Sequence, residues 1–95
     1  MAVLTFVSAT IAPEHRDEVI RPFTEGVAAG LPPGLRQTFL LVGEDDTVAV
    51  ASVWERREDL DAMLASGEEP FARRVLREAG GEPEARVFDI AVERG

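Results

Sequence analysis

Hydrophobic and polar positions change their period several times along the chain, and these changes predict its elements. Val3–Ile11 is rich in β-branched and apolar residues, which predicts a strand that ends before Pro13. A helix is expected next, because proline suits a first helical position and apolar residues then recur at three- and four-residue spacing. This apolar stripe consists of Val19, Ile20, Phe23, Val27 and Leu31.

The middle of the chain predicts a β-hairpin. Leu35–Gly43 and Thr47–Glu55 both have strand composition, and only the short acidic link Glu44-Asp45-Asp46 separates them. A link of this length joins two antiparallel strands.

The last third predicts an interrupted helix and a final strand. The helix is expected to open at Glu58-Asp59, to break at Ser66–Glu69 and to resume at Pro70. Ser66 and Glu69 have the spacing of a capping box at the start of the resumed helix. Arg86–Val92 is predicted to be the last strand.

The predicted order is β-α-β-β-α-β, which indicates an α+β, ferredoxin-like fold with two helices on one face of an antiparallel sheet. At 95 residues the chain has room for one domain, residues 1–95, and for one modest core.

The strands are apolar on both faces, although two helices cover only one face. In Thr47–Glu55, for example, Val48 and Val50 alternate with Ala49 and Ala51. An apolar face exposed to water would lose hydrophobic stabilisation and favour aggregation. We therefore expect a homodimer in which two sheets pack face to face, a dimeric α+β barrel. The alternative is a monomer with an unusually apolar sheet.

Charge and composition exclude several functions. The net charge of −8 disfavours nucleic acid and membrane surfaces as partners. No apolar run approaches the length of a membrane span, and the chain contains no cysteine, so a cytoplasmic location is expected. All ten basic residues are arginine, which leaves no lysine for a Schiff base.

Several short motifs resemble the antibiotic biosynthesis monooxygenase family of dimeric α+β barrels. The Trp54-Glu55 pair stands at the end of the third predicted strand, as a Trp-Glu pair commonly does in that family. Three further segments fit, namely Pro13-Glu14, Pro33-Gly34-Leu35 and Gly80-Gly81-Glu82-Pro83. The resemblance covers nearly the whole chain, and each motif is short.

The resemblance implies a pocket between sheet and helices, and cofactor-independent oxidation of a planar aromatic or polyphenolic metabolite. Trp54 and Arg74 match residues that line the pocket of the phenol-oxidising branch, so they are the candidate catalytic residues. The asparagine that accompanies the tryptophan in that branch is replaced by Val50. The haem-degrading branch requires an asparagine and a histidine that this chain lacks, so haem degradation is not expected.

Oxidation without metal or flavin requires a substrate that itself becomes an electron-rich anion, which the protein stabilises and shields from water. Arginines suit the anion, and aromatic side chains suit a planar ring. The candidate substrate-binding residues are Phe6, Ser8, Phe23, Phe39 and Phe71. The alternatives are a packing role for Trp54 and a solvated position for Arg74.

No cofactor and no metal are expected. His15 is the only histidine and is expected to be exposed, no nucleotide-binding glycine motif is present, and the acidic residues are scattered. A second function therefore stays open beside the oxygenase, namely a non-catalytic dimeric protein that binds a small aromatic ligand or acts in a stress response.

Overall fold

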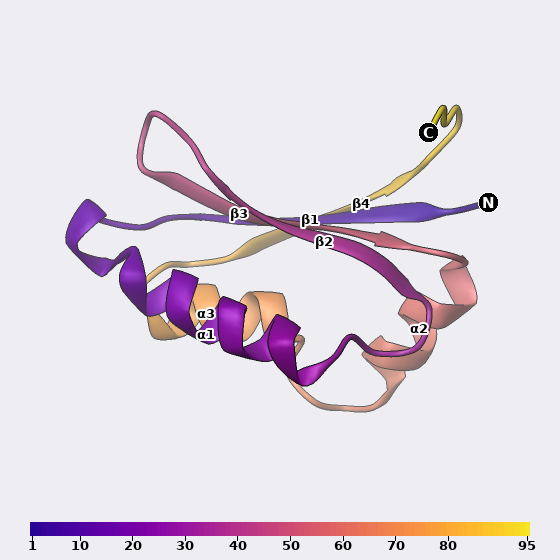
Figure 1. Ribbon diagram of the computed structural model, residues 1–95, viewed down its shortest axis with the longest axis horizontal. Helices are drawn as coiled ribbons and strands as arrows, with labels where there is room; N and C mark the ends of the chain where they lie inside the picture. Colours follow the sequence, from indigo (N-terminus) through magenta and orange to yellow (C-terminus); the bar gives the residue numbers. More distant parts are fainter.

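A computed structural model describes all residues 1–95 and shows a four-stranded antiparallel sheet with every helix on one side (Figure 1). The strands are β1 (Val3–Thr10), β2 (Leu35–Val42), β3 (Thr47–Trp54) and β4 (Glu84–Asp89). Their order across the sheet is β2-β3-β1-β4. The predicted ferredoxin-like α+β fold is confirmed.

The helical layer contains one short 3₁₀ turn and three α-helices. The turn η1 (Pro13–His15) leads into α1 (Asp17–Ala29), and α2 (Arg57–Ala65) and α3 (Phe71–Glu78) connect β3 to β4. The second predicted helix is therefore two helices. None of the helices is both long and apolar enough to cross a membrane.

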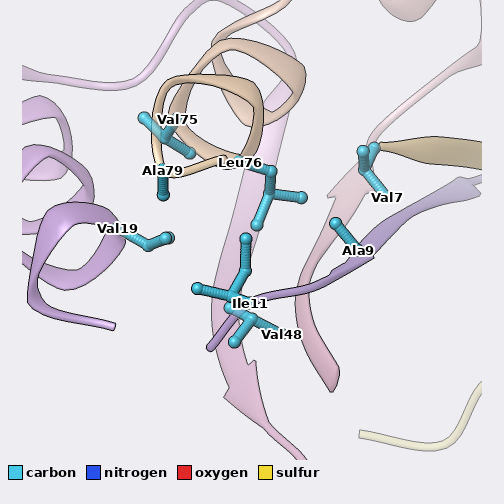
Figure 2. Close-up of a cluster of buried hydrophobic side chains, with 8 residues drawn as sticks. All are labelled: Val7, Ala9, Ile11, Val19, Val48, Val75, Leu76 and Ala79. Carbon is cyan, nitrogen blue, oxygen red and sulfur yellow. The ribbon is translucent and has the colours of Figure 1, made fainter. Parts of the chain in front are cut away.

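The core occupies one end of the space between sheet and helices (Figure 2). Val19 of α1 and Leu76 of α3 are fully buried there against Ile11, which follows β1. Figure 2 shows these side chains converging from the three segments. The remaining members of this cluster are Val7, Ala9, Val48, Val75 and Ala79.

A second, smaller cluster lies at the other end of the sheet. Val3 at the start of β1 and Trp54 at the end of β3 are cross-strand neighbours, and Leu60 of α2 packs on them. All three are almost fully buried. The helices are thus anchored to the sheet at two separate places.

Two details of the sequence prediction are wrong. Ser66 and Glu69 form no capping box, because the Ser66 hydroxyl donates to the carbonyl of Met63 and Glu69 accepts two hydrogen bonds from Arg77. The last strand is Glu84–Asp89 instead of Arg86–Val92. It pairs with β1, which begins at Val3 opposite Asp89, so later residues have no strand to pair with.

Candidate functional site

A cavity of about 390 Å³ lies between the sheet and the helices, in the interval between the two core clusters. This volume is within the usual range for small-molecule sites. The C-terminal half of α1, the start of α3 and three residues of α2 (Leu60, Met63 and Leu64) form its roof and sides, and the helix-facing side chains of the sheet form its floor. Most of the lining is apolar.

The floor carries three hydroxyl groups in one row. Thr5 of β1, Ser52 of β3 and Thr38 of β2 stand directly opposite one another across adjacent strands, and all three line the cavity. The Thr38 and Ser52 hydroxyls are hydrogen-bonded to each other at 2.9 Å. That bond uses one of their two protons, so the pair retains one proton for a ligand.

Trp54 closes one end of this row. Its indole Nε1–H donates a hydrogen bond to the Thr5 hydroxyl at 3.3 Å, and the side chain is only 3% exposed. Because Thr5 accepts this bond, its own hydroxyl proton remains available. The floor therefore offers at least two donor protons to a ligand oxygen within an apolar cavity.

A β-bulge positions the outer end of the floor. The pairing of β2 with β3 shifts between Leu35 and Gln37, so Leu35 lies opposite Trp54 while Thr38 lies opposite Ser52. In a regular strand, residues three apart would face opposite sides of the sheet. The extra residue, Arg36, allows Leu35 and Thr38 to line the same cavity.

Two phenylalanines and an arginine bound the helical side. The rings of Phe23 on α1 and Phe71 on α3 have centroids 6.3 Å apart, and both line the cavity. Arg73 lines it as well, and its Nη1 donates to the carbonyl of Pro83 at 3.2 Å, which anchors the guanidinium.

The candidate residues from the sequence fall into two groups. Trp54, Phe23 and Phe71 come together around the cavity. Arg74 does not line it. Arg74 is exposed, and its guanidinium carbon lies 5.4 Å from the centre of the Phe71 ring. Adjacent residues of a helix point in directions about 100° apart, which is why Arg73 and not Arg74 reaches the lining.

Phe6, Ser8 and Phe39 lie away from the cavity. Alternation along β1 places Phe6 and Ser8 on the opposite face from Thr5 and Val7, and Phe39 pairs with Ala51 on that same face. Ser8 lines a separate polar hollow near the end of the sheet. The two phenylalanines instead belong to the uncovered face described below.

Titratable groups are scarce at the site. Arg73 and Arg86 are the lining cations, and no lining residue carries a carboxylate or an imidazole. His15 lies outside, in η1, where a hydrogen bond to the Glu18 carboxylate raises the pKa of its ring. No group of three or more histidine or carboxylate side chains is placed to hold a metal ion.

Thr5 and Arg73 were not singled out from the sequence. Thr5 resembles any other threonine of an apolar strand, and only its hydrogen bond to Trp54 distinguishes it. Val50 lines the floor at 2% exposure, so the position where the resembled family carries asparagine does face the cavity.

No protein-family profile matches the sequence, and no curated protein is significantly similar to it. Solved structures are similar in fold. A point mutant of SnoaB, a cofactor-independent oxygenase from Streptomyces nogalater, superposes with a TM-score of 0.70 at 18% identity, covering 97% of this chain and 95% of that one.

Two further structures have the same fold. A candidate antibiotic biosynthesis monooxygenase from Deinococcus radiodurans has a TM-score of 0.73 at 10% identity, covering 98% of this chain and 96% of the other. The heme-degrading protein Rv3592 from Mycobacterium tuberculosis has a TM-score of 0.71 at 20% identity over the full length of both chains. The chain therefore has the fold of the antibiotic biosynthesis monooxygenases, as its short motifs indicated.

Proposed function

We propose that this protein binds a planar aromatic or polyphenolic metabolite in the cavity and oxidises it with dioxygen, without a cofactor. The observation that carries the proposal is the row of hydroxyls beside Trp54 on the floor of an apolar cavity. Apolar walls suit an aromatic ring, and the few convergent donors suit its oxygen substituents. The oxygenase fold of SnoaB supports the choice of reaction by analogy.

Within this proposal each part of the lining has a distinct role. Phe23 and Phe71 contact the ring of the ligand, while Thr5 and the Thr38–Ser52 pair donate hydrogen bonds to its oxygens. Arg73 stabilises the negative charge that develops on an ionised substrate, and a largely apolar cavity strengthens that interaction by excluding water. Trp54 orients the Thr5 hydroxyl.

Arg74 acts indirectly in this scheme, through Phe71. It stacks on the outer side of Phe71 and so holds that ring in place, without reaching the cavity itself. The candidate catalytic pair from the sequence, Trp54 and Arg74, thus becomes Trp54 and Arg73, with Arg74 as a positioning residue.

The lining provides no general base, because it contains no carboxylate and no imidazole. The proposed substrate must therefore ionise readily by itself, as a phenol or enol stabilised by conjugation does, before its anion reacts with dioxygen. The same observation favours the second candidate function, which is binding of an aromatic ligand that leaves unaltered.

We also propose that the protein functions as a homodimer. The face of the sheet opposite the helices carries no covering layer (Figure 1). Three of its large side chains are exposed by more than 40%, namely Phe39, Leu41 and Phe88. Between them lie Phe6, Ala49, Ala51 and Val53. A contiguous apolar face of this kind is typical of an interface.

The test of the proposed reaction is oxygen uptake by the purified protein with a panel of anthrones, hydroquinones and polyphenols. Wild-type uptake should exceed the uncatalysed rate, and Trp54→Phe should lower it by about tenfold or more, since the indole donor to Thr5 is lost. Ile20→Ala, at an exposed position of α1 outside the cavity, is the control and should keep the wild-type rate.

One outcome would contradict the oxygenase proposal, and another would contradict the role given to Trp54. If a panel compound binds and is recovered unchanged with no oxygen consumed, the non-catalytic binding protein is the correct function. If uptake occurs at the same rate in Trp54→Phe, the tryptophan has no part in the reaction.

A further inference from the structure

Gly26 of α1 faces the ring of Phe71 on α3 so closely that a Cβ at position 26 would fit only if the ring shifted. A Cβ built at position 26 would lie 2.4 Å from Cζ of Phe71, 2.9 Å from Cε1 and 3.1 Å from Cε2. These three atoms are the far end of the ring, so the ring tip rests in the space that a methyl group would fill. Both residues line the cavity.

The Phe71 ring is held on several sides. Phe23 packs at 6.3 Å between centroids with an interplanar angle of 32°, and the Arg74 guanidinium covers the ring from outside at 5.4 Å. The backbone N–H of Arg74 donates to the carbonyl of Pro70, the N-cap residue immediately before Phe71, which fixes the first turn of α3. The ring has open space on its cavity side.

A methyl group at position 26 would therefore move the ring toward the cavity. Ordinary carbon–carbon contacts lie near 3.5–4.0 Å, so the ring tip must retreat by about 1 Å. Retreat outward would expose the ring to water and separate it from Phe23, whereas retreat inward keeps its apolar surface buried. Inward movement of the Phe71 ring would shorten the cavity between α1 and α3.

We propose that Gly26 and Phe71 together determine the size of the ligand, because the missing side chain at position 26 lets the Phe71 ring sit back from the cavity. The inference rests on the proposal that the cavity binds a planar aromatic molecule, and it concerns the size of that molecule. Alanine at position 26 is predicted to shift the preference of the site from larger to smaller ring systems.

The single tryptophan provides a binding assay that does not depend on turnover. Trp54 lines the same cavity, so a bound aromatic should quench its fluorescence. Benzenesulfonate, 2-naphthalenesulfonate and 2-anthracenesulfonate form a water-soluble series of one, two and three rings that requires no reaction with oxygen. The ratio of three-ring to one-ring affinity is the quantity to measure.

Gly26→Ala should lower the affinity for the three-ring probe by about tenfold and leave the one-ring probe nearly unchanged, because overpacking penalises only the ligand that needs the space. Phe71→Leu removes the ring tip, so the double variant Gly26→Ala with Phe71→Leu should bind the three-ring probe as tightly as Phe71→Leu alone. Glu25→Ala, at an exposed neighbouring position, should behave as wild type. Alanine has a higher helix propensity than glycine, so the Gly26→Ala variant is expected to fold.

An unchanged ring preference in Gly26→Ala would overturn the inference while leaving ligand binding intact. A folded double variant that binds the three-ring probe about tenfold more weakly than Phe71→Leu alone would also overturn it, since the Phe71 ring would not be the obstacle. If none of the probes binds the wild-type protein, the proposal that the cavity binds a planar aromatic molecule is wrong, and this inference is wrong with it.

Discussion

At the scale of single residues, two adjacent arginines on α3 have different surroundings. Arg73 lines the cavity and is anchored on the Pro83 carbonyl, while Arg74 is exposed and stacks on the outer side of Phe71. A charge that faces an apolar cavity interacts more strongly with a ligand anion than a charge in water does. Arg73 is therefore placed to act on a ligand directly, and Arg74 only through Phe71.

Arg73→Gln should weaken binding of an anionic aromatic such as 2-naphthalenesulfonate by about tenfold or more, since hydrogen bonds to charged groups are worth about 1.5–3 kcal/mol. Arg74→Gln is the matched substitution and should change the affinity by less than about threefold, because it removes only a partly exposed cation–π contact. Quenching of Trp54 fluorescence measures both. An equal loss of affinity in Arg73→Gln and Arg74→Gln would refute the distinction between a direct and an indirect role.

At the scale of elements, the break between α2 and α3 lies beside the cavity, because residues on both sides of it line the cavity. The segment between them turns at Gly67, whose φ of +81° lies in the left-handed region that glycine adopts without strain. The break is closed by Glu69, which accepts two hydrogen bonds from Arg77 of α3, at 2.7 and 2.8 Å. This contact ties the connecting segment to the helix that carries Phe71 and Arg73.

The Glu69–Arg77 contact predicts a specific pH dependence of stability. The hydrogen bond from Arg77 lowers the pKa of Glu69 below its ordinary value. A carboxyl with a depressed folded-state pKa contributes stability above its unfolded pKa of about 4 and loses that contribution as pH falls through the folded value. Arg77→Gln should thus be less stable than wild type at neutral pH and approach it in acid, as measured by urea denaturation at both pH values.

Arg57→Gln serves as the control for that experiment, because Arg57 pairs with Asp61 within α2 and does not touch the connecting segment. A stability difference between Arg77→Gln and wild type that persists undiminished below pH 3 would show that the contact acts through packing and not through the charge of Glu69.

At the scale of the whole molecule, the two sides of the sheet are unequal. One side carries the helices and the cavity, and the other presents an apolar face without a cover (Figure 1). Ala49 and Ala51 are buried on the uncovered face, and Ala51 lies between its larger cross-strand neighbours Phe6 and Phe39. A second copy of the chain would bury those larger side chains as well.

A charge on the uncovered face should therefore prevent dimerisation. Wild-type protein is expected to sediment as a dimer and Phe39→Glu as a monomer, because the carboxylate would be desolvated in the interface. Ile20→Glu places the same charge at a similarly exposed apolar position on α1 and should leave the dimer intact. Sedimentation equilibrium distinguishes these outcomes, and a monomeric wild-type protein would refute the dimer.

The order of the elements, the fold class and the two apolar faces of the sheet could be predicted from the sequence, because each depends on local periodicity and on turn residues. The first three strands begin at the predicted residues and each ends one residue earlier than predicted. The last strand was misplaced because its length depends on where β1 begins, which is a long-range pairing.

The composition of the site depended on tertiary structure. Alternation shows that Phe6 shares a face with Ser8 and that Thr5 shares one with Val7, but it does not show which face the helices cover, so Phe6, Ser8 and Phe39 were grouped with a cavity that they do not reach. The rotation of α3 placed Arg73 rather than Arg74 in the lining. The sequence by itself determined which residues lie together on each face of the sheet. Only the packing of the helices on the sheet decided which face became the floor of a cavity, because that choice depends on contacts between distant segments.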